Sequence, residues 1–208
     1  VTPNAPFQTI EELGTYIKEN PGELRAGASA AGSIHHLNLL AFEKGVGGSF
    51  NYIPYDGSAP SQNAAMTGEI TVVITSVAEQ AQLIRGGQLR PLAVLIPEDF
   101  RFGDQTFPSA FSTIDGLEEY LPISQAIGFA IAKDAPMDVK EVLWDAFDQA
   151  MAGDAVQTWL DENYYVASGA TGDEANATFD KLEANFAWTL WDLGAAKVDP
   201  ATLNIPRP

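Results

Sequence analysis

The sequence predicts an α/β fold built on a parallel sheet, and three observations lead to that prediction. Short apolar segments alternate with helix-like segments over the first hundred of the 208 residues. Glycine or proline punctuates many of the boundaries between them. Residues 70–75 form a nearly continuous β-branched run, which is typical of a strand buried on both faces. Strict alternation of strand and helix favours right-handed crossovers, and therefore parallel strands with helices on both faces of the sheet.

Capping signals and chain breakers place the first elements. Thr9 and Glu12 match a capping box, so we expect a helix that begins after Thr9 and ends at Asn20-Pro21-Gly22. The other elements expected in this half are, in order, a strand over 24–28, a helix over 33–44, a strand over 50–53, a helix with Ser58 as N-cap that reaches residue 67, a strand over 70–75, a helix that ends at Arg85 and a strand over 92–96.

The second half does not keep this alternation. Residues 97–122 contain several prolines and aromatic residues, which predicts an irregular connection. We then expect a strand over 127–132 and three helices, which begin near Pro136, near Asp154 and near Asp173. The last helix carries one apolar stripe at helical spacing, formed by Phe179, Leu182, Phe186, Leu190 and Leu193.

The composition excludes several classes of partner. Eleven basic residues against 28 acidic ones give a net charge of −17, which repels nucleic-acid phosphates and anionic lipid surfaces. The chain has no cysteine, so disulfides and cysteine-based metal sites are ruled out. No apolar run approaches the roughly 20 residues of a bilayer-spanning helix. The opening Val1-Thr2-Pro3 shows no leader sequence and resembles a mature or truncated start.

Two strand-to-helix junctions are the best candidates for a ligand site. They are Gly27 to Ser33 and Tyr55 to Ala59, both rich in small residues. Ligands of open parallel sheets bind beyond the carboxyl ends of the strands, where helix N-termini offer unpaired N–H groups to an anion. The hydroxyls of Ser29, Ser33 and Ser58 add further donors, so the pattern predicts a carboxylate site. The alternative is that these residues only close turns and cap helices.

Asp56 is out of place in a loop expected to bind an anion, because its carboxylate repels one. The carboxylate either points into solvent as an ordinary turn residue or pairs with an amine or a metal on the ligand.

A serine hydrolase is a second interpretation of the same loop. Ser29 follows a strand and precedes a helix, but its Gly-x-Ser-x-x-Gly spacing differs from the Gly-x-Ser-x-Gly nucleophile elbow. A triad requires His35 or His36 to reach Ser29 with a carboxylate behind it. The two histidines are adjacent on a helix, point about 100° apart and cannot share one metal face. No metal or cofactor is expected.

Several segments resemble, in order, those of the TctC (Bug) family of solute-binding proteins of tripartite tricarboxylate transporters. The matching segments are Pro6 to Leu13 with Asn20-Pro21-Gly22, Gly27 to Ser33 with His36-Leu37, Ile53 to Pro60, Thr67-Gly68-Glu69, Gly87 to Val94, Ala132 to Pro136 and Leu193 to Pro206. The resemblance covers nearly the whole chain. Members of the family have about 100 further residues before the region that this chain matches.

The resemblance implies a type II periplasmic binding protein, in which two α/β lobes close on a ligand. Residues 5–122 would form the second lobe, and residues 123–208 would be the returning segment of an incomplete first lobe. Such a protein is periplasmic, captures a small carboxylate for the membrane permease of the transporter and is not an enzyme. A ligand-sensing domain of a regulator is a further alternative, disfavoured because the sequence has no helix-turn-helix and no basic face.

The resemblance also assigns the ligand-binding residues, which form the second lobe's share of the site. They are Ser29, Ala30, Ala31, Gly32, Ser33, Tyr55, Asp56, Gly57, Ser58 and Ala59, with Thr75 and Ser76 at the end of the next strand. Asp56 stands where the family usually has a basic residue, and Thr71 where an aspartate is common. We also expect the chain by itself to self-associate or to bind ligand poorly, because the returning segment would expose an apolar face.

Overall fold

Three parallel strands form the centre of the computed structural model, which describes residues 1–119 and 123–208. The strands are β1 (Arg25–Ala28), β2 (Asn51–Pro54) and β3 (Val72–Val73), in the spatial order β2-β1-β3. Both pairings of the central strand are parallel, and Gly27 of β1 lies opposite Ile53 of β2 and Val73 of β3. The predicted parallel sheet is therefore confirmed.

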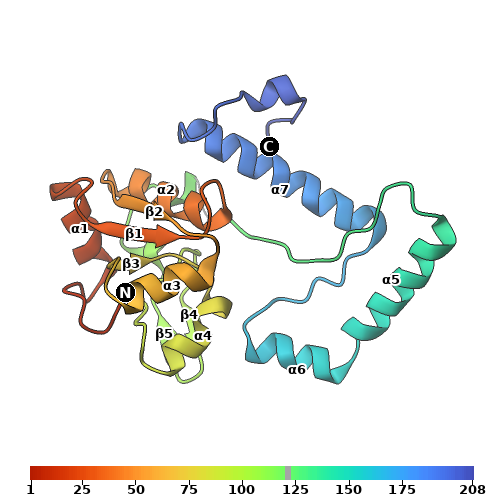
Figure 1. Cartoon of the computed structure of the whole chain (residues 1–208), viewed down its shortest axis with the longest axis horizontal. Helices are drawn as coiled ribbons and strands as arrows, with labels where there is room; N and C mark the ends of the chain where they lie inside the picture. Colours follow the sequence, from red (N-terminus) through yellow and green to blue (C-terminus); the bar gives the residue numbers. More distant parts are fainter. Residues whose placement is uncertain (120–122) are drawn as a thin grey trace.

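Helices cover both faces of this sheet, as the alternation predicts (Figure 1). The helices are α1 (Ile10–Glu19), α2 (Ile34–Val46), α3 (Ser58–Met66) and α4 (Val77–Arg85). The apolar residues of α1 and α2 pack with Ala26 and Val72 in one core cluster, and those of α3 pack with Ile70 and Val73 in another. Because neighbouring residues of a strand point to opposite faces, these two clusters lie on the two sides of the sheet.

The capping residues explain where three of the helices begin. The side chains of Thr9, Ser33 and Ser76 each accept a hydrogen bond from a backbone N–H three residues later, and Ser76 forms a complete capping box with Glu79. At Thr9 the box is incomplete, because the Glu12 carboxylate accepts from the N–H of Gln8 instead.

The predicted N-cap of α3 is wrong by one residue. Gly57 occupies the cap with φ 118°, and Ser58 is the first helical residue. The reason is conformational, since glycine adopts this positive φ without the steric penalty that a serine has there.

The secondary structure of residues 92–119 differs from the prediction in two places. One predicted strand is nearly absent, and a hairpin forms where an irregular connection was predicted. The expected strand 92–96 forms only a single parallel bridge, between Val94 and Ser109. The segment expected to be irregular contains an antiparallel hairpin of β4 (Phe100–Phe102) and β5 (Gln105–Phe107), followed by two 3-10 turns, η1 (Ala110–Ser112) and η2 (Leu117–Glu119). The rest of that predicted connection, 120–122, lies outside the described residues.

The C-terminal residues form an arm that extends away from the α/β part (Figure 1). Its elements are α5 (Met137–Met151), α6 (Asp154–Glu162), α7 (Gly172–Asp192) and the 3-10 turn η3 (Pro200–Leu203), which confirms the three predicted helices. Helix α7 contacts α2, and α5 contacts α6. None of the helices described for 1–119 and 123–208 combines the length and hydropathy needed to cross a membrane.

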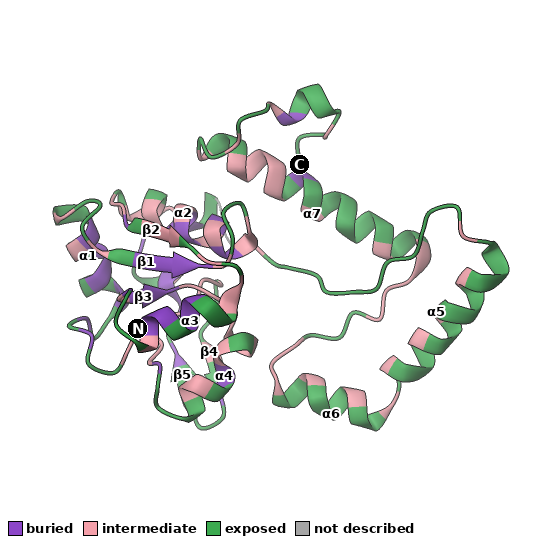
Figure 2. Cartoon of the chain, in the orientation of Figure 1, coloured by how far each residue is buried: buried purple, intermediate pink, exposed green. Residues whose placement is uncertain are grey.

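Little of this arm is buried (Figure 2). The predicted strand over 127–132 is wrong: these residues lie in no strand, and Ile127 and Phe129 are 72% and 95% exposed. A strand requires a neighbour to pair its N–H and C=O groups, and the described part of the chain places none beside this segment. The apolar stripe of α7 is also largely uncovered, since Phe179 is 48% exposed and only Ala184 of the helix is buried.

Candidate functional site

The predicted loops follow the carboxyl ends of the three parallel strands, at one edge of the sheet. The loops after β1 and β3 lead to α2 and α4, which pack on opposite faces of the sheet. Such a change of direction between neighbouring strands opens a crevice beyond their carboxyl ends, which is the usual ligand position in open α/β sheets. The loop after β2 brings the N-terminus of α3 to the same edge.

Ser29 lies at this edge of the sheet, directly after the central strand β1. Its Oγ lies 2.8 Å from the Oγ of Ser33 and 2.8 Å from the Nδ1 of His35. The hydroxyl of Tyr52 donates to the carbonyl oxygen of Ser29 at 2.8 Å, which fixes the backbone of the loop. The structure thus brings together the two serines predicted for this loop.

Glu79 of α4 contacts His35 of α2, and this contact joins the loop after β3 to the loop after β1. One of its carboxylate oxygens lies 3.4 Å from the Nε2 of His35, and the same oxygen accepts from the backbone N–H and the hydroxyl of Ser76. Burial raises the pKa of Glu79, but hydrogen bonds from Ser76 and Ser58 and the field of His35 outweigh this and leave that pKa below its ordinary value. Glu79 is therefore an ionised carboxylate.

His35 is the neutral member of this group. Its side chain is 9% exposed, and burial lowers the pKa of the imidazole despite the opposing field of Glu79. A neutral imidazole donates from one nitrogen only. The Nε2 nitrogen faces an ionised carboxylate, so Nε2 carries the proton, and Nδ1 accepts the hydroxyl proton of Ser29. The result is a chain of hydrogen bonds from Ser33 through Ser29 and His35 to Glu79.

The N-terminus of α3 forms the other side of the site. Its cap, Gly57, makes no side-chain capping bond, so the first N–H groups of the helix stay available to a ligand. The hydroxyl of Ser61 donates to the carbonyl oxygen of Ser58, and the amide of Gln62 donates to the Oγ1 of Thr75 at 3.0 Å. Ser58 and Ser76 both hydrogen-bond to Glu79, so these two predicted site residues and Thr75 link α3 to the loop before α4.

The other predicted residues lie at the same loops but contribute differently. Ala30, Ala31, Gly32 and Ala59 are exposed and offer only backbone groups. Tyr55 packs over Gly27 and its hydroxyl donates to the Oε1 of Glu69, a residue at the opposite end of β3, so this hydroxyl points away from the crevice. Asp56 is exposed.

The two histidines diverge, as their adjacency predicts. His36 accepts the N–H of Gly32 at its Nδ1 and stacks on Tyr52 at 4.2 Å between ring centroids, whereas His35 faces Ser29 and Glu79. The geometry that a triad requires is therefore present at His35. Sequence reasoning missed Glu79, although the Ser76-x-x-Glu79 capping box could have indicated that its carboxylate reaches back toward the strand end.

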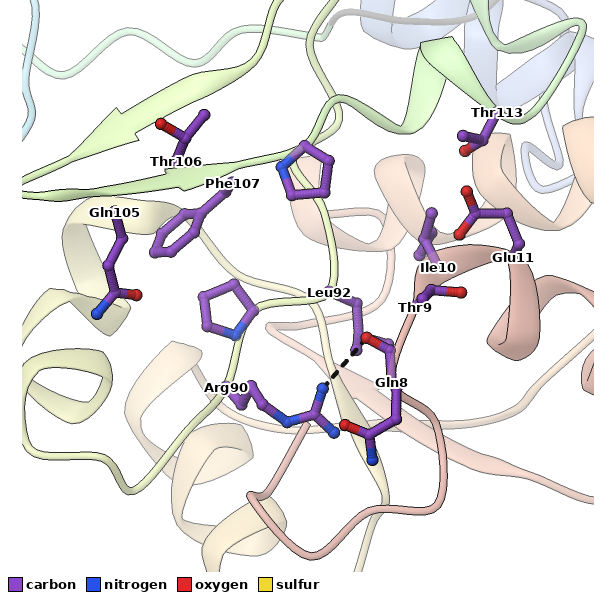
Figure 3. A pocket seen from close by; sticks show the side chains of 12 residues that line it. Gln8, Thr9, Ile10, Glu11, Arg90, Leu92, Gln105, Thr106, Phe107 and Thr113 are labelled. Carbon is purple, nitrogen blue, oxygen red and sulfur yellow. Dashed lines mark hydrogen bonds between the residues drawn. The ribbon is translucent and has the colours of Figure 1, made fainter.

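A separate pocket of about 370 Å³ lies at the start of α1 (Figure 3). Its lining includes Thr9, Glu11, Arg90 and Phe107, and none of the predicted site residues. The Arg90 guanidinium donates to the carbonyl oxygens of Phe7 and Gln8, so its charge already has partners inside the protein. This pocket is not the site that the loops form.

The chain matches the family model of the "Tripartite tricarboxylate transporter family receptor", TctC, over residues 1–177. The chain belongs to this receptor family. Its curated relatives include a UPF0065 protein of Cupriavidus necator, 31% identical over 156 residues, and a UPF0065 protein of Bordetella pertussis, 26% identical over 161 residues. These alignments cover 73% and 77% of this chain but only 44% and 49% of the relatives, so the chain spans about half of their length.

Solved structures support the same fold. A periplasmic transporter superposes with a TM-score of 0.77 at 23% identity, and an R. palustris protein solved with adipate gives 0.70 at 24%. MatC from Rhodopseudomonas palustris with bound malate gives 0.69 at 16%. These matches cover 96%, 93% and 92% of this chain and 64% of each solved chain. At these identities the likeness concerns the fold.

Proposed function

We propose that this chain is the ligand-binding part of a periplasmic receptor that captures a small carboxylate for a tripartite tricarboxylate transporter. The observation that carries the proposal is the convergence of three loops, with the N-termini of α2, α3 and α4, at one crevice. Helix N-termini and hydroxyls are donors suited to a carboxylate, and the receptor binds its ligand without transforming it. The partner that receives the ligand is the membrane permease of the transporter.

The domain assignment is part of this proposal. Residues 5–122 form the second lobe of a two-lobed, type II binding protein, and residues 123–208 are the returning segment of the first lobe. Two observations support it. The solved chains are only 64% covered, and the arm leaves Ile127 and Phe129 exposed in a segment that pairs with no described strand. The ligand would lie between this lobe and the rest of the first lobe, which would close by a hinge motion.

The ligand class follows from the donors and from the relatives. Adipate and malate, present in two structurally similar proteins, are both dicarboxylates. The binding groups of this chain are Ser29, Ser33, Gly57, Ser58 and the backbone N–H groups of the loops that hold them. Asp56 at the rim adds a negative charge, so it disfavours highly charged acids and favours a ligand that carries an amine.

Backbone NMR of the 208-residue chain tests this function, because it detects weak binding by a single lobe. Adipate, malate, citrate and aspartate are titrated at constant ionic strength, with chloride as the control anion. We expect amide shifts confined to the loops at 29–33 and 57–59. A hydrogen bond to a charged ligand contributes about 1.5–3 kcal/mol, so Ser29→Ala should weaken binding at least about tenfold. Ser124→Ala, at an exposed position outside the loops, is the matched control. A folded chain whose loop amides respond to no acid contradicts the proposal.

Hydrolysis is a second candidate because Ser29, His35 and Glu79 stand in the order nucleophile, base and carboxylate. In such a reaction the Ser29 Oγ would attack the acyl carbon of an ester while its proton passes to His35, the C–O bond to the leaving alcohol would break as His35 returns that proton, and water would then hydrolyse the acyl-enzyme. The test is turnover of small nitrophenyl esters. Turnover that is abolished in Ser29→Ala and in His35→Ala favours the hydrolase, and turnover that persists in both variants excludes it.

A further inference from the structure

We propose that His35 couples carboxylate capture to the uptake of one proton, through the hydrogen-bond chain Ser29–His35–Glu79. The inference rests on the proposed function and adds a property to it. The affinity for a carboxylate is then set by pH as well as by the shape of the crevice.

The argument begins with the hydroxyl of Ser29, which has a single proton. In the free chain this proton is held inside the protein, between the Nδ1 of neutral His35 and the Oγ of Ser33, each 2.8 Å from the Ser29 Oγ. Ser29 therefore presents lone pairs, and not a donor, to the crevice. A carboxylate ligand also presents lone pairs, so the free state of the serine is mismatched to the ligand.

Protonation of His35 reverses this mismatch. When Nδ1 gains a proton it becomes the donor to Ser29, and the hydroxyl proton of Ser29 leaves that contact for the Oγ of Ser33, 2.8 Å away, or for a carboxylate ligand, which is the stronger acceptor. The proton comes from solvent, and no bond between heavy atoms changes. The hydroxyl then donates to the carboxylate, and such a charge-assisted hydrogen bond is stronger than one between neutral groups.

Charge favours the same coupling. Of the described residues, Glu79 on α4 is the charged group in contact with His35, and His36 on the same helix points away toward Tyr52. In the free state the negative charge of Glu79, held by hydrogen bonds from Ser76 and Ser58, faces a neutral imidazole and repels an incoming anion. The protonated imidazole compensates Glu79, and the bound anion in turn stabilises the imidazolium.

The sign of the pH dependence follows. Burial holds the pKa of His35 below its ordinary 6.5 in the free chain, and an anion bound nearby raises it. Between these two pKa values, binding takes up a proton. The affinity is therefore highest below the free-state pKa, falls by up to about tenfold per pH unit as the pH rises between the two values, and levels off above the bound-state pKa.

The experiment is an NMR titration of the whole chain with adipate and with malate, from about pH 6 to about pH 8.5. We expect the dissociation constant to rise with pH in the wild type and to change less steeply in His35→Gln. Ionisation of the acids contributes equally to both proteins, so the difference in slope reports His35. His36→Gln is the matched control and should keep the wild-type slope. Equal slopes in the wild type and His35→Gln overturn the inference.

Nitrogen-detected spectra of the imidazoles give a test that needs no folded His35 variant. We expect the Nε2–H tautomer for His35 in the free chain and an imidazolium when adipate is bound at about pH 6.5. Glu79→Gln should lower the pH at which this change occurs. An Nδ1–H tautomer, or a ring that stays neutral on binding, overturns the inference and leaves carboxylate capture intact. Failure of both acids to bind at any pH overturns carboxylate capture and this inference together.

Discussion

At the scale of single residues, the site depends on side chains that hold one another rather than on free functional groups. Ser29 contacts both Ser33 and His35, and Glu79 contacts His35 and Ser76. Each group therefore has a defined orientation before a ligand arrives. Preorganised donors bind more tightly because the ordering cost is already met in the free protein.

Glu43 gives a test of buried charge away from the site. Its Oε1 accepts the N–H of Phe50 at 2.5 Å, and burial raises the pKa of the carboxyl above its ordinary 4.5. A raised carboxyl pKa means that the folded state prefers the protonated form. The contribution of Glu43 to stability is therefore greatest at low pH and is lost as the pH rises through and above 4.5.

Glu43→Gln should consequently stabilise the chain at neutral pH, since the amide oxygen keeps the bond to Phe50 without the buried charge. We expect the thermal midpoint to rise by roughly 1–2 °C at neutral pH and the gain to disappear in acid. Circular dichroism melts at the two pH values measure this, with Glu19→Gln as an exposed control. A variant less stable than the wild type at neutral pH would show that the carboxylate is needed as an anion.

At the scale of elements, the central strand β1 positions the site because its neighbours pack directly against its backbone. A Cβ added at Gly27 would lie 2.6 Å from the Cδ1 of Ile70 and 2.8 Å from the Cε2 of Tyr55. These distances are shorter than normal contacts, so a side chain at Gly27 requires the side chains of Ile70 and Tyr55 to shift.

Gly27→Ala is therefore expected to destabilise the chain by about 1–3 kcal/mol through overpacking. Urea unfolding measures the free energy of unfolding of the α/β part. Gly128→Ala is the matched control, because a Cβ there meets only the ring of Phe179 at 3.9 Å. Equal stability of the two variants would mean that Tyr55 and Ile70 move aside at little cost.

At the scale of the whole molecule, the arm and the α/β part differ in how they are stabilised. The α/β part contains all but two of the buried side chains among the described residues, those of Ala184 and Pro200. Large apolar residues of the arm are exposed instead, among them Phe129 at 95% and Val166 at 96%. Exposed apolar faces and a strand segment without a neighbour favour association with another chain.

We expect the chain by itself to sediment as a dimer or larger species, above its mass of 22.3 kDa. Replacing Ile127 and Phe129 together by serine should shift the distribution toward the monomer, because it removes the most exposed apolar residues of the unpaired segment. The matched control is Gln105→Ser, at an exposed position of the α/β part. Sedimentation velocity and light scattering measure the mass, and a wild-type chain that stays monomeric at high concentration contradicts this expectation.

The sequence by itself determined the α/β class, most of the helix boundaries and the small-residue loops that follow the strands. Each of these depends on local signals: the spacing of apolar residues, the caps at Thr9 and Ser33, and small residues at the ends of strands. Only the tertiary structure decided that His35 faces Glu79, that Tyr55 turns away from the crevice, and that residues 127–132 remain unpaired. Those features depend on which segments lie side by side, and that depends on contacts between residues far apart in the chain.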